Sequence, residues 1–105
     1  MNRINFYKAG SHMPRKHIRS AISGTLLAHG AHDVAVSVSC VDKEKMAEYV
    51  KKYYKRDDKE HLVLAFPNSD IEGDLGDIII QNTDIETMAG LAAHATLHLL
   101  GVHHD

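Results

Sequence analysis

The sequence of 105 residues is poor in the residues that cross-link, kink or anchor a chain. It contains one cysteine, two prolines and no tryptophan, and its only aromatic residues are two Phe and four Tyr. A single cysteine cannot form an internal disulfide, which fits a reducing compartment. No stretch reaches the ~18 apolar residues of a membrane span, and the N-terminus lacks the apolar core of a signal peptide. We therefore expect a cytoplasmic protein with no membrane partner, folded as a single domain over residues 1–105.

Basic residues are absent from the second part of the chain. Residues 60–105 hold eight Asp and Glu and no Lys or Arg, whereas residues 1–59 hold all twelve Lys and Arg and six acidic residues. If the basic part folds along one side of a cleft, it forms a surface that attracts phosphate. Two solvated helices that are merely basic would have the same composition, so both interpretations stay open.

Periodicity predicts an α+β fold with the element order β-α-β-α-β-β-α. Apolar runs, alternating or continuous, predict strands at 3–8, 33–41, 61–67 and 75–81. Spacing of apolar residues by three and four predicts helices at 14–30, 42–55 and 84–100. Such an order indicates a mixed sheet of about four strands covered by about three helices.

Helix boundaries have recognisable signals. Gly30 is a predicted stop for the first helix, and Asp42 is a predicted N-cap for the second. Thr83 and Glu86, three residues apart, form a predicted capping box at the start of the third.

Cysteine and tyrosine positions follow the same periodicities. Cys40 alternates with the valines of its strand, which predicts a buried thiol. Tyr49, Tyr53 and Tyr54 lie at helical spacing on the second helix. This spacing favours a position at the edge of the core over a base-stacking platform.

The third predicted helix carries histidines at metal-ligand spacing. His94 and His98 are four residues apart, so both imidazoles project from one face of the helix. Gly101 permits the turn that ends a helix, after which His103 or His104 can return toward the same ion. Three imidazoles with a fourth position for water are typical of a catalytic Zn²⁺ site. The other five histidines show no ligand spacing and are interpreted as surface residues, although His17 or His61 could line a cleft.

Ala95 bears on which zinc chemistry is available. The metzincin proteases have the pattern H-E-x-x-H-x-x-G-x-x-H, in which the Glu is the general base. Ala95 occupies that position here and cannot accept a proton from a water molecule. The pattern therefore disfavours proteolysis.

Four stretches of the sequence resemble one known family. The segment "HATLHLLGVHH" (94–104) is in register with H-G-x-L-H-L-x-G-Y-D-H, the hallmark of the YbeY family of metal-dependent single-strand endoribonucleases. "LVLAFP" (62–67) resembles that family's D-V-L-S-F-P, and "LGDIIIQ" (75–81) resembles its G-D-I-x-I strand. Residues 37–56 resemble its strand, acidic turn and helix ending in Tyr-Arg. The resemblance covers most of the chain from residue 33 onward.

The resemblance implies a function and a set of site residues. It implies a mixed sheet covered by helices and one Zn²⁺ held by His94, His98, His104 and a water molecule. The implied activity is cleavage of single-stranded RNA in ribosomal RNA maturation and ribosome quality control, with the small ribosomal subunit as a further partner. The family has an Arg near the end of its second helix, and this position corresponds to Lys55 or Arg56, either of which could contact the scissile phosphate.

Departures from the family pattern leave two alternatives open. His103 stands where the family has Asp, and one residue follows His104. One alternative is a metal-stabilised module that binds RNA or the ribosome with weak or no catalysis. The other is a zinc hydrolase of another class, which would need a base in place of the missing Glu.

Overall fold

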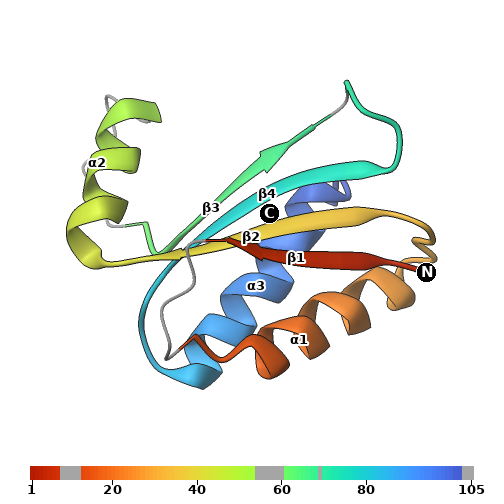
Figure 1. Ribbon diagram of the computed structural model, residues 1–105, viewed down its shortest axis with the longest axis horizontal. Coiled ribbons are helices and arrows are strands. Elements are labelled where there is room, and N and C mark those ends of the chain that lie inside the picture. The colour runs from red at the N-terminus through yellow and green to blue at the C-terminus, as the bar shows by residue number, and fades with distance from the viewer. Residues whose placement is uncertain (8–12, 54–60, 69, 103–105) are drawn as a thin grey trace.

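The structure, a computed structural model, describes residues 1–7, 13–53, 61–68 and 70–102 (Figure 1). It confirms the predicted α+β fold, with one mixed sheet of four strands and three helices in the order β-α-β-α-β-β-α. In chain order the elements are β1 (Arg3–Tyr7), α1 (Arg15–Ala28), β2 (Ala35–Val41), α2 (Lys43–Tyr53), β3 (Val63–Pro67), β4 (Asp74–Gln81) and α3 (Ile85–Leu99). No helix within these described ranges is long and apolar enough to cross a membrane.

The strands lie in the order β1-β2-β4-β3. β1, β2 and β4 are parallel, and β3 runs antiparallel to β4. Parallel neighbours need a crossover, and α1 supplies it between β1 and β2. β3 and β4 are joined by a short connection that turns at Gly73, whose φ of +82° suits glycine. This topology leaves β3 as an edge strand of the sheet.

One face of the sheet is covered by α1 and α3 (Figure 1). Alternation in the strands sends every second side chain to this face, as with Val36 and Val38 of β2 and Ile78 and Ile80 of β4. Together with one stripe from each helix they form the main core. Its twelve buried members are Ile4, Ile18, Ile22, Leu26, Val36, Val38, Ile78, Ile80, Met88, Ala92, Ala95 and Leu99. The half-buried Cys40 packs against this core, so the predicted burial is partial, and it raises the pKa of the thiol.

Of the described helices, α2 alone lies on the opposite face, near one end of the sheet (Figure 1). Three buried residues, Val41, Met46 and Leu64, form a small second core there. Tyr49 and Phe66 are among the partly buried residues that pack around it. The second core is thus a local contact between one helix and the strands beneath it.

Gly76 lets β3 and β4 approach closely. Its φ is +136°, and a Cβ at this position would lie 2.1 Å from the carbonyl oxygen of Phe66. Gly76 is the register partner of Pro67 across the two strands. Only glycine fits this position without moving the edge strand.

The helix caps confirm one predicted signal and correct another. Asp42 accepts a hydrogen bond from the backbone N–H of Lys45 at 2.8 Å, as predicted for an N-cap. At α3, the prediction of Thr83 as the cap was wrong. Asp84 is the N-cap, and its carboxylate accepts hydrogen bonds from both the backbone N–H and the hydroxyl of Thr87. Aspartate and threonine are both good caps, and the helix begins one residue later than the capping box requires.

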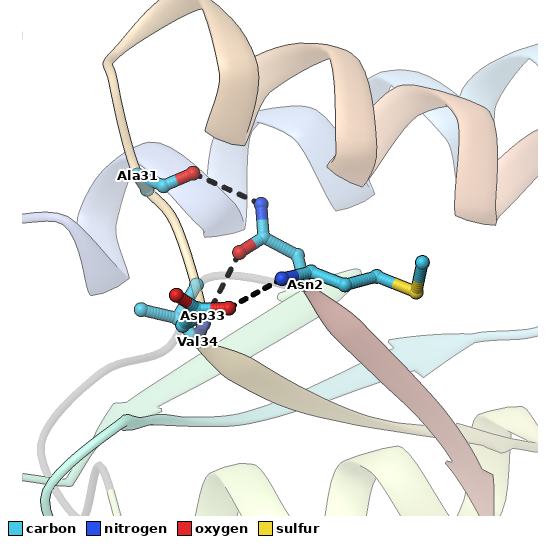
Figure 2. Close-up of polar contacts among 5 residues, drawn as sticks. Asn2, Ala31, Asp33 and Val34 are labelled. Atoms are coloured by element: carbon cyan, nitrogen blue, oxygen red, sulfur yellow. Dashed lines mark hydrogen bonds and ion pairs between the residues drawn. The ribbon is translucent and has the colours of Figure 1, made fainter.

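The connection from α1 to β2 is tied to the start of β1 (Figure 2). Asn2 donates from its amide nitrogen to the carbonyl of Ala31 at 3.0 Å and accepts from the N–H of Val34 at 3.1 Å. Asp33, with a φ of +56°, contacts the amino group of Met1, and this contact lowers the pKa of the Asp33 carboxyl. These bonds hold the parallel strands β1 and β2 in register where they begin.

Candidate functional site

α3 presents the predicted histidine pair beside its buried stripe. Ala95 and Leu99 of α3 face the main core, while His94 and His98 are exposed. The two Nε2 atoms are 3.0 Å apart, the ring centroids are 4.6 Å apart and the rings meet edge to face. The helical spacing therefore brings the two imidazoles together, as the sequence predicts.

The separation of the two nitrogens fits two kinds of contact. Two imidazoles on a tetrahedral Zn²⁺ with Zn–N bonds of ~2.0–2.1 Å would have their nitrogens ~3.3 Å apart. The observed 3.0 Å is within a few tenths of an ångström of that value. It also fits a hydrogen bond in which the N–H of one ring donates to the other ring. The pair is thus close to chelating geometry, and a small rotation of either ring completes it.

The histidine pair lies in a pocket of about 560 Å³ between α3 and the edge strand β3. Ligand pockets in proteins are commonly of this size. On the strand side the lining consists of residues 61–65 and Pro67, and on the helix side it consists of Leu91, His94, Ala95 and His98. Every one of these lining residues is either apolar or a histidine, and no Asp or Glu occurs among them.

One backbone edge of β3 faces away from β4 and has no neighbouring strand among the described residues. The carbonyl of Leu62 accepts from the N–H of Gln81, and the N–H of Asn68 donates to the carbonyl of Leu75. In an antiparallel pair these bonds recur at every second residue, so the even-numbered residues of β3 bond to β4. The backbone N–H groups of Val63 and Ala65 consequently point toward the outer edge, and both residues line the pocket.

His61 joins the two helical histidines in the pocket lining. It lies just before β3, and no ligand spacing in the sequence connects it with His94 or His98. Of the two histidines considered for a cleft, His17 or His61, the structure places His61 in the pocket lining. His17, the other histidine considered for a cleft, is exposed on α1 and is not part of this lining. His61 could have been recognised from its position next to a strand at the sheet edge. Recognising it in this way requires the strand order, which the sequence does not give.

Ala95 is 1 % exposed and its side chain lies between the pocket and the main core. Ala95 stands at the sequence position that the general-base Glu occupies in proteases of the metzincin type. The methyl group packs instead of accepting a proton. A catalytic base in the described lining would have to be a histidine.

After α3 the chain reverses at Gly101, whose φ is +80°. The N–H of Gly101 donates to the carbonyl of His98 at 3.0 Å, and the N–H of Val102 donates to the carbonyl of Leu97 at 2.9 Å. These two bonds form a Schellman motif, as the glycine predicts. The turn redirects the chain immediately after the histidine pair.

Four residues with a predicted role at the site lie outside the described residues: Lys55, Arg56, His103 and His104. The third predicted ligand and the predicted phosphate contacts are therefore not placed. Among the residues that are described, no group of three or more His, Cys, Asp or Glu is arranged to hold a metal ion.

Fold and site together define an α+β domain that carries a helical histidine pair in a pocket at its sheet edge. No family model matches the sequence. The comparison with curated proteins likewise found no match.

Proposed function

We propose that the protein is a metal-dependent hydrolase that cleaves single-stranded RNA. His94, His98 and His104 are the proposed ligands of one Zn²⁺, with a water molecule as the fourth ligand. The observation that carries the proposal is the pair of Nε2 atoms 3.0 Å apart inside a pocket. The resemblance of residues 94–104 to the endoribonuclease motif supports the choice of RNA over other substrates.

The pocket residues suit the binding of a phosphodiester. Zn²⁺ held by three histidines lowers the pKa of bound water toward ~7 and polarises a phosphoryl oxygen. The outward N–H groups of Val63 and Ala65 can donate to non-bridging phosphate oxygens. The apolar lining, including Leu91, lowers the local dielectric and strengthens these hydrogen bonds. Lys55 or Arg56 is the proposed further phosphate contact.

The proposed cellular role follows from the same resemblance. Ribosomal RNA is the proposed substrate, the small ribosomal subunit a further partner and the cytoplasm the location. The basic composition of residues 1–59 favours a polyanionic partner.

Substitution of His98 by Ala tests this proposal. We expect the variant to lose bound metal and to lose single-strand RNA cleavage by at least about a hundredfold, because one ligand of the site is removed. Metal content per chain and cleavage of a labelled single-stranded RNA, with and without chelator, are the measurements. His17→Ala is the matched control, since His17 is exposed on α1 outside the pocket lining. Unchanged metal content together with unchanged cleavage in His98→Ala would contradict the proposal.

One structural observation favours a second candidate function, a metal-stabilised RNA-binding module. The described pocket lining holds no carboxylate to act as a general base. Such a module would melt at a higher temperature with Zn²⁺ than without it and would bind RNA without cleaving it. A zinc hydrolase of another class would instead cleave a peptide or another ester in a substrate panel that includes RNA.

A further inference from the structure

Aromatic rings form a row on the sheet face that α2 covers. Tyr49 and Tyr53 stack with their centroids 6.5 Å apart and an angle of 17° between the rings. Tyr53 in turn meets Phe66 of β3, with centroids 5.0 Å apart and an angle of 58°. The row therefore runs from α2 onto the edge strand.

The two tyrosines differ in burial. Tyr49 is partly buried against the second core, which confirms the predicted position at the core edge. Tyr53 is 50 % exposed, although it packs on Phe66. Half of its surface thus remains accessible while its orientation is set by a neighbouring ring. Tyr54 lies outside the described residues.

Lysines accompany both rings. The Nζ atom of Lys45 is 5.5 Å from the centroid of Tyr49, and that of Lys52 is 5.3 Å from the centroid of Tyr53. Lys45 also pairs with Glu48 at 3.2 Å. Lys52 takes part in neither of the two ion pairs found among the described residues. α2 as a whole has four Lys and two Glu, and its net charge is positive.

Only the thickness of the edge strand separates this row from the pocket. The side chain of Phe66 packs with the second core, whereas its neighbour Ala65 packs against the main core and lines the pocket. Successive side chains of a strand point to opposite faces, which explains the division. Among the described strands β3 has a neighbour on one side only, so we expect a flexible chain that crosses its other edge to reach both the histidine pair and Tyr53.

We propose that Tyr53, supported by Phe66 and flanked by Lys52, is a stacking site for an unpaired base of single-stranded RNA. A half-exposed ring held in place by a second ring, next to a cation, is the combination with which proteins bind single strands. The Lys52 ammonium lies over the Tyr53 ring, so a base that stacks on the exposed part of the ring displaces the ammonium, which then contacts the adjoining phosphate. The choice of RNA over DNA rests on the proposed function, whereas binding through Tyr53 does not depend on cleavage.

The test measures binding under conditions that prevent cleavage. A fluorescently labelled single-stranded RNA of about twelve nucleotides is titrated with protein in the presence of chelator at low salt. We expect Tyr53→Leu to weaken binding about tenfold and Tyr53→Phe to bind like the wild type, because stacking needs the ring and not the hydroxyl. Lys52→Met should make the dependence of log affinity on log salt shallower by about 0.7, the value for one phosphate contact on a single strand.

Tyr7→Leu is the matched control. Tyr7 is 54 % exposed on β1, at the other edge of the sheet, so its loss removes a similar exposed ring from a distant place. A duplex RNA of the same length serves as a second control, since its bases are not free to stack. Melting temperatures show whether each variant is folded.

Each outcome bears on one proposal. Equal affinities of Tyr53→Leu and the wild type would overturn the stacking site, as would an equal loss in Tyr7→Leu or an absence of RNA binding in the wild type. A protein that needs Tyr53 for binding but cleaves no RNA with Zn²⁺ would keep the stacking site and contradict the nuclease. If Tyr53→Leu binds and cleaves RNA as the wild type does, the stacking site is contradicted and the nuclease proposal is kept.

Discussion

The two faces of the sheet differ in the size of the hydrophobic core that each carries. Among the described residues, the face covered by α1 and α3 contains twelve buried core residues, and the face covered by α2 contains three. Burial of a large aliphatic side chain contributes ~1.5–3 kcal/mol, so the first face supplies most of the hydrophobic stabilisation. Both candidate functional surfaces lie where the two faces meet, on either side of the edge strand β3. The main core thus stabilises the fold, while the edge of the sheet at β3 carries both candidate binding surfaces.

The largest expected effect comes from the place where β3 and β4 approach most closely. Gly76→Ala should destabilise the protein by at least ~3 kcal/mol, because the new Cβ would clash with the backbone of Phe66 and the φ of +136° is strained for alanine. Chemical denaturation measures the change. Gly24→Ala is the matched control: Gly24 lies within α1, and beyond its own stretch of helix backbone its added Cβ would meet nothing within 4 Å, so the substitution should stabilise by ~0.5–1 kcal/mol. Equal effects of the two substitutions would refute the tight approach at Gly76.

A smaller effect distinguishes the two cores. Ile22→Ala in the main core should lower the free energy of unfolding by ~3–5 kcal/mol, and Met46→Ala in the second core by ~2–3 kcal/mol. Ile22 is 0 % exposed and Met46 is 1 % exposed, so burial of the residue itself does not explain the difference. The difference arises because the few residues around Met46 can relax into the cavity more easily than the large core around Ile22 can. Denaturation curves of both variants test this order, and a greater loss in Met46→Ala would invert the ranking of the two faces.

The smallest effect concerns the start of α3. Hydrogen bonds from the Thr87 hydroxyl and backbone lower the pKa of the Asp84 carboxyl. A lowered folded-state pKa means that the stabilisation is complete above the unfolded value of ~3.9 and is lost as the pH falls through the folded value. Asp84→Ala should therefore lower the melting temperature at pH 7, and its gap from the wild type should narrow below pH ~3.9. Thr83→Ala should leave the melting temperature nearly unchanged, because Asp84 and not Thr83 is the cap. A larger fall in melting temperature for Thr83→Ala than for Asp84→Ala would show instead that Thr83 caps the helix.

Local patterns predicted the elements and the histidine pair. Alternating valines in β2 and the apolar stripe of α1 each carry their period within one segment, so element type could be predicted from the sequence. The same holds for His94 and His98, since four residues of helix suffice to bring their rings together. The prediction of Thr83 as the N-cap of α3 was wrong because two adjacent residues can both cap a helix, and only the tertiary position of α3 decides between them.

Features that depend on strand order could not be predicted. The sequence does not indicate that β3 lies at the edge of the sheet, and without that fact neither the pocket nor the place of His61 in it can be inferred. The exposure of Tyr53 has the same origin. Its helical spacing is that of a core residue, but α2 covers only one end of its sheet face, and the second core is too small to bury the ring.

The described residues that line the pocket all come from one stretch of chain, residues 61–98. β3, β4 and α3 follow one another in that stretch, whereas β1 and β2 pair only after α1 has crossed between them. Closing a short loop loses less chain entropy than closing a long one, and local contacts therefore tend to form first during folding. Loop closure thus favours a folding order in which the β3–β4 hairpin and α3 form the pocket and the β1–α1 unit docks onto it afterwards.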